Sequence, residues 1–69
     1  MNTDFQIELD QEEDGRWIAE ITALRGVLAY GFTQDEAISR VQALALRVIA
    51  ERIDNGEIGS KINSLSFTH

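Results

Sequence analysis

The sequence has no cysteine and no proline, and its single histidine, His69, is the last residue. The absence of cysteine excludes disulfides and thiolate metal sites. A histidine at a fraying terminus is a poor base for a serine nucleophile and a poor metal ligand. We therefore expect no metal, no other cofactor and no catalytic triad.

Positive charge is also scarce: six lysine and arginine residues stand against twelve acidic ones, for a formal net charge of −6. Nucleic-acid binding needs clustered basic residues, so we do not expect direct binding. An acidic surface either only keeps a protein soluble or also attracts a basic partner. The composition leaves both readings open.

Long apolar runs are missing as well. No segment approaches the ~18–20 apolar residues that cross a membrane, and the start, MNTDFQIELD, lacks the basic and apolar regions of a signal peptide. We expect a cytoplasmic protein that does not contact a membrane. The 69 residues form one domain, 1–69, with a small core. Because neither disulfides nor a metal supplement that core, we expect a homo-oligomer.

The first half of the chain has the pattern of three strands. Residues 4–10 alternate apolar and polar side chains, an acidic stretch ending in Gly15 follows, and residues 16–22 alternate again. This pattern is typical of a β-hairpin. Residues 27–32, VLAYGF, predict a third strand, in which Gly31 marks a bulge or a close backbone approach.

Alternation assigns the side chains of these strands to two faces. In the second strand the faces are Trp17, Ala19 and Ile21 on one side and Ile18 and Glu20 on the other. In the third strand they are Leu28, Tyr30 and Phe32 against Val27 and Ala29. Both faces of the third strand are apolar, so we expect it to be covered on both sides. A contact of Trp17 with Phe5 across the hairpin depends on a register that the sequence leaves open.

A long helix follows the third strand. TQDE forms a capping box, in which Thr33 is the N-cap and Glu36 reaches back to the amide of Thr33. Apolar residues recur at helical spacing over 37–49. Asn55 or Gly56 is able to end the helix in the left-handed conformation.

A last alternating strand at 62–67 gives the order β-β-β-α-β, an α+β fold with a mixed sheet and one long helix packed on one face. The other face is then solvated or buried against another molecule. Candidate oligomer contacts are Ile18 and Leu28 on that face and Leu46 and Ile53 at the margin of the helix's apolar face. For the latter two, scattered surface exposure is an equal alternative.

The many carboxylates raise a catalytic reading. Glu8 and Glu20 lie on polar strand faces, where they are able to approach each other. A carboxylate-dependent hydrolase would need both, together with an acid on the helix, to bind Mg²⁺. No spacing in the sequence demands such a site, and we expect no enzymatic activity.

The stretch DGRWIAEITALRGVLAYGFTQDEA, preceded by the strand FQIEL, contains an ordered set of features. They are Asp14-Gly15 in the hairpin turn, Trp17, Ala19-Glu20, the corner Leu24/Gly26, Gly31 in the third strand, and Thr33, Glu36 and Ala37 at the helix start. This order resembles the N-terminal domain of the HicB antitoxin family over about residues 4–56.

The resemblance implies a partial ribonuclease-H-like fold without nuclease activity, assembled as dimers or tetramers. It also implies a partner, because family members bind and block a small basic toxin, HicA, that cleaves messenger RNA. An acidic antitoxin suits a basic toxin. The residues that we expect at the partner interface are Trp17, Glu20, Leu24, Arg25 and Tyr30, each with fold maintenance as its alternative role.

Two features depart from the family pattern. The corner at Leu24 usually carries prolines, which the segment TALRG lacks. Full antitoxins also append a DNA-binding domain, for which these residues leave no room, so operator binding is not carried over. The alternative function is a stand-alone homo-oligomeric adaptor or regulatory module that keeps the fold without a toxin partner.

Overall fold

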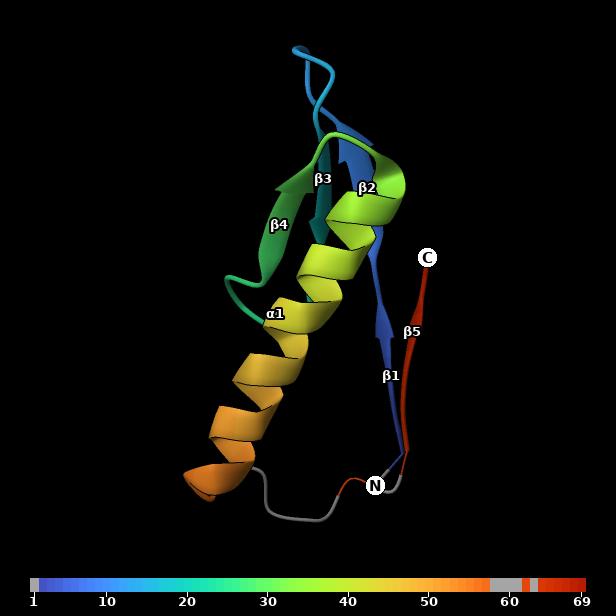
Figure 1. Ribbon diagram of the computed structural model, residues 1–69. Coiled ribbons are helices and arrows are strands. Elements are labelled where there is room, and N and C mark those ends of the chain that lie inside the picture. The colour runs from blue at the N-terminus through green and yellow to red at the C-terminus, as the bar shows by residue number, and fades with distance from the viewer. Residues whose placement is uncertain (1, 58–61, 63) are drawn as a thin grey trace.

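The computed structural model describes residues 2–57, 62 and 64–69, and its architecture is α+β (Figure 1). In chain order the elements are β1 (Asn2–Gln6), β2 (Glu8–Gln11), β3 (Trp17–Glu20), β4 (Leu28–Gly31), α1 (Gln34–Asp54) and β5 (Ser64–Thr68). The order agrees with the predicted one, except that the first predicted strand is divided in two. Within the described residues, no helix has the length and apolar character needed to cross a membrane.

The division falls at Ile7, where the chain changes its pairing partner. β1 pairs in parallel with β5, whereas β2 pairs antiparallel with β3, which in turn pairs antiparallel with β4. The N–H of Ile7 donates to the carbonyl of Thr68 at 2.6 Å. Phe5, Ile7 and Leu9 all contribute to the core, so the predicted alternation continues through the break. The last strand therefore returns parallel to the first strand of the chain.

The strand pairing decides whether Phe5 and Trp17 lie opposite each other, which the sequence left open. Phe5 lies opposite Phe67 of β5, with ring centroids 6.1 Å apart. Trp17 lies between Gln11 of β2 and Gly31 of β4. The register therefore does not pair Phe5 with Trp17.

The helix begins as predicted, with one difference in its cap. The hydroxyl of Thr33 accepts a hydrogen bond from the N–H of Glu36 at 3.1 Å. The carboxylate of Glu36 accepts from the N–H of Phe32 at 3.2 Å, so the predicted bond to the Thr33 amide was wrong by one residue. The same carboxylate pairs with Arg40 at 3.2 Å, which holds it beside β4.

The helix ends in a Schellman motif. Gly56 adopts a φ of +72°, which only glycine reaches without steric cost. The N–H of Gly56 donates to the carbonyl of Ile53 at 3.1 Å, and that of Glu57 to the carbonyl of Arg52 at 2.8 Å. Of the two predicted terminators, Gly56 is therefore the left-handed one.

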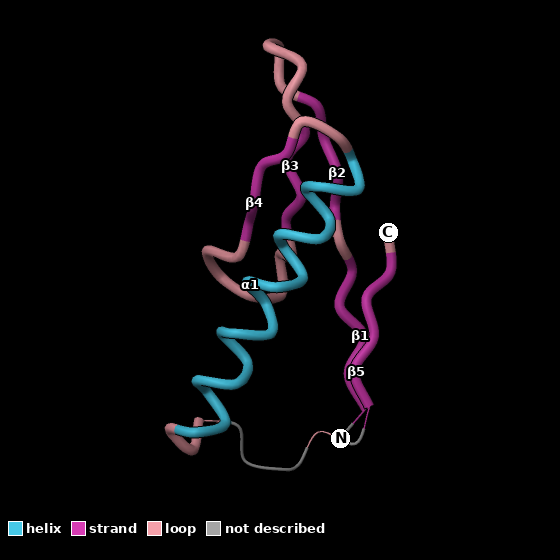
Figure 2. Tube along the Cα trace, in the orientation of Figure 1, coloured by secondary structure: helices cyan, strands magenta, loops and turns pink. Residues whose placement is uncertain are grey.

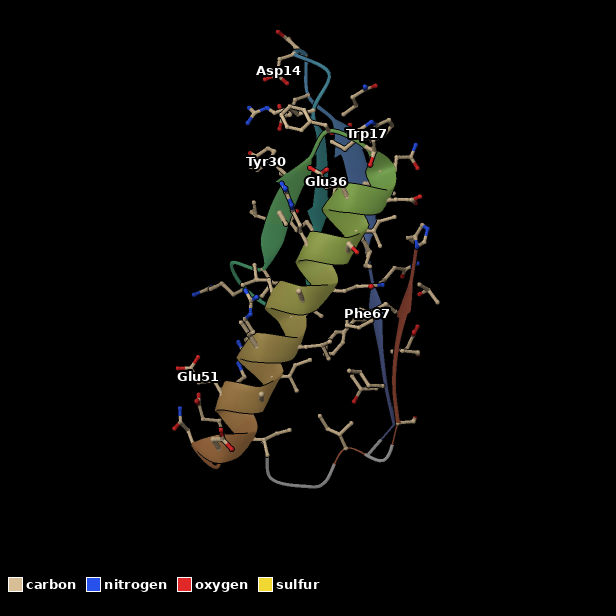
Figure 3. All side chains as sticks on the ribbon, viewed as in Figure 1. Asp14, Trp17, Tyr30, Glu36, Glu51 and Phe67 are labelled. Carbon is tan, nitrogen blue, oxygen red and sulfur yellow. The ribbon has the colours of Figure 1, made fainter. Side chains whose placement is uncertain are left out.

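The core lies between α1 and the β2–β3–β4 sheet, and Figure 2 shows the first half of α1 lying across these strands. Gly31 is the predicted close approach, because a Cβ built there would lie 2.5 Å from the backbone nitrogen of Ala37. The second half of α1 runs beyond this sheet, and Phe67 lies between β5 and the helix (Figure 3). The molecule is accordingly long and thin, 41 × 20 × 15 Å. The buried apolar residues are Ile7, Ala19, Ile21, Leu24, Val27, Ala37, Ile38, Val41, Ala45 and Ile49.

Candidate functional site

The sheet face that turns away from α1 is the candidate interaction site. In β3, Ala19 is fully buried under the helix, so its neighbours Ile18 and Glu20 point to the opposite side. The same alternation applies to β2 and β4. We call this surface the open face; its residues are Glu8, Asp10, Ile18, Glu20, Leu28 and Tyr30.

The strand register arranges the open face in two rows across the sheet. One row is Glu8, Glu20 and Leu28, from β2 to β4. The other row is Asp10, Ile18 and Tyr30. Both rows begin with an acid on β2 and end with an apolar or aromatic residue on β4, so the open face has an acidic half and an apolar half.

The acidic half forms a shallow groove of about 620 Å³. Four of the six residues that line it carry carboxylates, and none is basic. Glu8 and Glu20 are direct cross-strand neighbours, a placement in which like charges destabilise a sheet. A positively charged group in the groove would relieve that repulsion. The lining residues are Glu8, Leu9, Asp10, Glu12, Ile18 and Glu20.

The apolar half lies on β4. Leu28 and Tyr30 are 37% and 39% exposed, and Phe32, just after the strand, is 76% exposed. The prediction that both faces of this strand are covered was therefore wrong, because α1 covers only the face of Val27 and Ala29 and no second layer lies on the other among the described residues.

An arginine from the hairpin turn reaches this apolar half. The guanidinium of Arg16 lies over the ring of Tyr30, 4.9 Å from its centroid, in cation–π geometry. Asp14 holds the arginine from the other side: its carboxylate accepts from the Arg16 side chain at 2.8 Å and from the Arg16 backbone N–H at 3.1 Å. The backbone hydrogen bond is the main reason why the pKa of Asp14 lies below its usual value, with the Arg16 charge adding to it.

The structure divides the five predicted partner residues. Glu20 and Tyr30 lie on the open face. Trp17 lies on the other face, half-buried against the core, and Arg25 is exposed at the corner before β4. Leu24 is 5% exposed within the core, so it supports the fold and offers no surface to a partner. We correct the prediction for Leu24 on that ground.

The four predicted oligomer contacts also fall into two groups. Ile18 and Leu28 adjoin Tyr30 and Glu20 on the open face. Leu46 and Ile53 are 48% and 47% exposed on α1, the layer that covers the opposite side of the sheet. The four residues therefore do not form one surface.

Sequence reasoning missed two parts of the site. Asp10 and Glu12 join Glu8 and Glu20 in the groove, and the period-two spacing of Glu8, Asp10 and Glu12 was a signal for a shared face. The contact of Arg16 with Tyr30 had no comparable signal, because it depends on the pairing of β3 with β4.

The catalytic reading is weakened by the placement of the helix. Glu8 and Glu20 lie opposite each other on neighbouring strands, but α1 lies across the other face of the sheet, so an acid on the helix does not reach them. Over the described part of the chain, no three acidic, histidine or cysteine side chains are grouped so as to hold a metal ion.

Comparisons of the chain with protein-family models, curated proteins and solved structures found no match. The fold and the site define a small α+β module with one sheet face under a helix and one open face, acidic on one half and apolar on the other.

Proposed function

We propose that this chain is a HicB-like interaction module that binds and neutralises a small basic RNA-cleaving toxin of the HicA type in the cytoplasm. Its α+β fold would be the partial ribonuclease-H-like variant of that family. The proposal rests on the ordered motif from Asp14 to Ala37 and on one structural observation, the carboxylate-lined groove of the open face.

The groove suits a basic partner by its charge and by its position. Its carboxylates lie on neighbouring strands, so a lysine or arginine placed between Glu8 and Glu20 would meet two acids at once. An RNA-binding surface is rich in such side chains. Inhibition would be steric, because a toxin surface held against the sheet would no longer be open to RNA, and no catalytic group of this chain is required.

Tyr30 and Leu28 would complete the interface with an apolar contact. Protein interfaces combine an apolar centre, in which aromatic residues and arginine are enriched, with a polar rim. Tyr30 with Arg16 over its ring offers such a centre beside the acidic groove. Glu20 connects the two halves, since it pairs with Glu8 on one side and with Leu28 on the other.

The second candidate is a homo-oligomeric adaptor or regulatory module that has the same fold and no toxin partner. The exposed apolar half of the open face favours it, because Leu28 and Tyr30 would serve a second copy as well as a toxin. The two candidates are distinguished by a short neighbouring reading frame that encodes a basic protein with a single internal histidine.

A direct test combines binding and RNA cleavage. The chain and the neighbouring basic protein are purified, and their dissociation constant is measured by calorimetry at several salt concentrations, together with toxin-catalysed RNA cleavage. We expect an equimolar amount of this chain to suppress cleavage. Glu8→Gln/Glu20→Gln should weaken binding about tenfold, which corresponds to ~1.4 kcal/mol, and should flatten its salt dependence.

The matched control is Glu51→Gln/Glu57→Gln, which removes the same charge from two exposed positions. Glu51 lies near the C-terminal end of α1 (Figure 3), and Glu57 follows the end of the helix. This variant should bind like the unmodified chain. If both variants weaken toxin binding equally, the carboxylates of the groove contribute no more to binding than other negative charges of the chain. Failure to bind any co-encoded basic protein, or unimpaired cleavage in the complex, would refute the proposal.

A further inference from the structure

The outer edge of β4 exposes backbone groups whose direction follows from the pairing of β4 with β3. The N–H of Ile21 donates to the carbonyl of Val27 at 3.0 Å, so these two residues bond toward each other. Hydrogen-bonded and non-bonded pairs alternate along an antiparallel ladder. Ala29 and Gly31 therefore bond toward β3, while the N–H and C=O groups of Leu28 and Tyr30 point outward.

Two side chains of α1 occupy one end of this edge. Arg40 donates to the carbonyl of Tyr30 at 3.0 Å, and the carboxylate of Glu36 accepts from the N–H of Phe32 at 3.2 Å. The remaining outward groups are the N–H and C=O of Leu28 and the N–H of Tyr30. Within the described residues we find no hydrogen-bond partner for them.

β4 and β2 are the two edge strands of the three-stranded sheet, and their side chains differ. β2 carries the acids Glu8 and Asp10 beside its free edge. β4 has the sequence LAYG, with no charge and no proline, and its exposed side chains are Leu28 and Tyr30. Natural proteins guard such edges with charges, prolines or bulges unless the edge is used.

We propose that two copies of this chain pair through β4, antiparallel, about a two-fold axis at Ala29. Leu28 of each copy lies opposite Tyr30 of the other, and these two positions exchange backbone hydrogen bonds in both directions. The outward groups are self-complementary in this register, as a two-fold interface requires. Arg40 then shares the Tyr30 carbonyl, which has a second lone pair.

The pairing also places the side chains favourably. Leu28 and Tyr30 of the two copies become cross-strand neighbours, and with Ile18 of each copy they form one apolar band in the middle of the joined open faces. The band stays on the open face, and the lateral contacts between the two copies remove from water part of the surface of Leu28 and Tyr30, which are 37% and 39% exposed in the single chain.

Charge selects β4 over β2 for this contact. With net charge −6 per chain, two copies repel unless their acids are kept apart. Pairing through β4 leaves Glu20 of one copy three strand spacings from Glu20 of the other, about 14 Å at ~4.8 Å per strand, which exceeds the Debye length of about 8 Å at physiological salt. Pairing through β2 would bring Glu8 and Asp10 of both copies into direct contact.

This inference goes beyond the proposed function and does not depend on a toxin. The acidic grooves lie on β2 and β3, at the two far ends of the joined sheet, and remain open to a partner. A failure of the toxin proposal therefore leaves the pairing of the two copies intact, and the reverse holds as well.

The first test is the oligomeric state of the full chain by sedimentation equilibrium. We expect a dimer. Leu28→Lys/Tyr30→Lys should raise the dimer dissociation constant at least tenfold. The matched control, Leu46→Lys/Ile53→Lys, adds the same charge at exposed apolar positions of α1 and should leave it unchanged. Circular dichroism checks that both variants are folded. A monomeric unmodified chain, or a dimer disrupted only by the α1 variant, overturns the proposal.

The second test determines the register of the contact between the two β4 strands, and it does not require a variant that disrupts the dimer. In the proposed register Ala29 of one copy lies opposite Ala29 of the other, and the two form a pair without backbone hydrogen bonds. The Cα atoms of such a pair lie about 4.5 Å apart, which is within disulfide range. Because the chain has no cysteine, Ala29→Cys should form a covalent dimer under mild oxidation, whereas Leu46→Cys should not. Absence of the Ala29→Cys cross-link, or equal cross-linking of both variants, overturns the pairing at β4.

Discussion

Gly31 is the residue that allows β4 and α1 to touch. It is buried, and a Cβ at this position would lie 2.5 Å from the nitrogen and 3.0 Å from the Cα of Ala37. Both atoms belong to the helix backbone, which cannot rotate away as a side chain can. The sequence indicated a special role for this glycine. The structure shows that the missing side chain leaves room for the backbone of α1 at Ala37.

We therefore expect Gly31→Ala to destabilise the fold by about 1–3 kcal/mol, the usual cost of overpacking. The measurement is the free energy of unfolding from urea titration followed by circular dichroism. Gly15→Asn serves as the comparison: nothing lies within 4 Å of a Cβ there, so any loss of stability reports only the backbone strain of a side chain at a φ of +92°. An unfolding free energy unchanged by Gly31→Ala would show that the helix start is free to shift.

Asp14 gives the hairpin turn a pH dependence of known sign. The hydrogen bond from the Arg16 backbone N–H, together with the Arg16 charge, lowers the pKa of Asp14 from its usual 3.8. A carboxyl whose pKa is lower in the folded state stabilises that state above its unfolded pKa, and this contribution is lost as the pH falls through the folded pKa.

The expected result is a titration of the Asp14 carboxyl, followed by NMR, with its midpoint below pH 3.8. The contact of Arg16 with Tyr30 should loosen over the same pH range, because Asp14 helps to orient the guanidinium. Asp14→Asn keeps a hydrogen-bond acceptor for the backbone and should abolish this pH dependence. A midpoint at or above pH 3.8 would contradict the assigned hydrogen bonds.

At the scale of elements, the strands differ in how well they are supported. β3 lies between β2 and β4 and under α1, and Ala19 is fully buried. Among the described residues β5 pairs with β1 alone, and no residue of β5 is fully buried. The outer face of that pair is bound by short polar contacts, in which Ser66 and Thr68 donate to the carboxylate of Asp4 at 2.7 and 3.3 Å.

The less supported strand, β5, should open locally more often than β3. We expect native-state hydrogen exchange to protect the amides of Ala19 and Ile21 at least about tenfold more than the best-protected amide of β5, because strand openings that expose little apolar surface cost less free energy. The comparison is made within one sample, so global stability cancels. Equal protection of β3 and β5 would mean that the chain opens only as a whole.

Element boundaries were largely predictable where local chemistry decides them. Thr33 and Gly56 delimit the helix as the sequence indicated, since capping and left-handed termination depend on a few adjacent residues. The break of the first strand at Ile7 was not predictable. The chain pairs with β5 before Ile7 and with β3 after it, and the residues of β5 lie some sixty positions away in the sequence. The acceptor of the Phe32 amide was missed for a similar reason, since Arg40 helps to place the Glu36 carboxylate.

At the scale of the whole molecule, the open face joins residues that the sequence had distributed among different roles. Glu20 and Tyr30 were expected at a partner interface, and Ile18 and Leu28 at an oligomer contact. The register places all four on adjacent positions of one surface. The proposals above assign the open face, chiefly its acidic half, to a basic partner and the outer backbone edge of β4 to a second copy, so that both contacts can be made at the same time.

By itself, the sequence determined the class of the fold, the face of each strand and the two ends of the helix, because these follow from periodicity and from contacts between near neighbours. Only the tertiary structure decided the strand register, the burial of Leu24, the separation of Leu46 and Ile53 from the open face and the meeting of Arg16 with Tyr30. These depend on which distant segments pair, and pairing is settled by the packing of one helix on one side of a sheet, which no local pattern encodes.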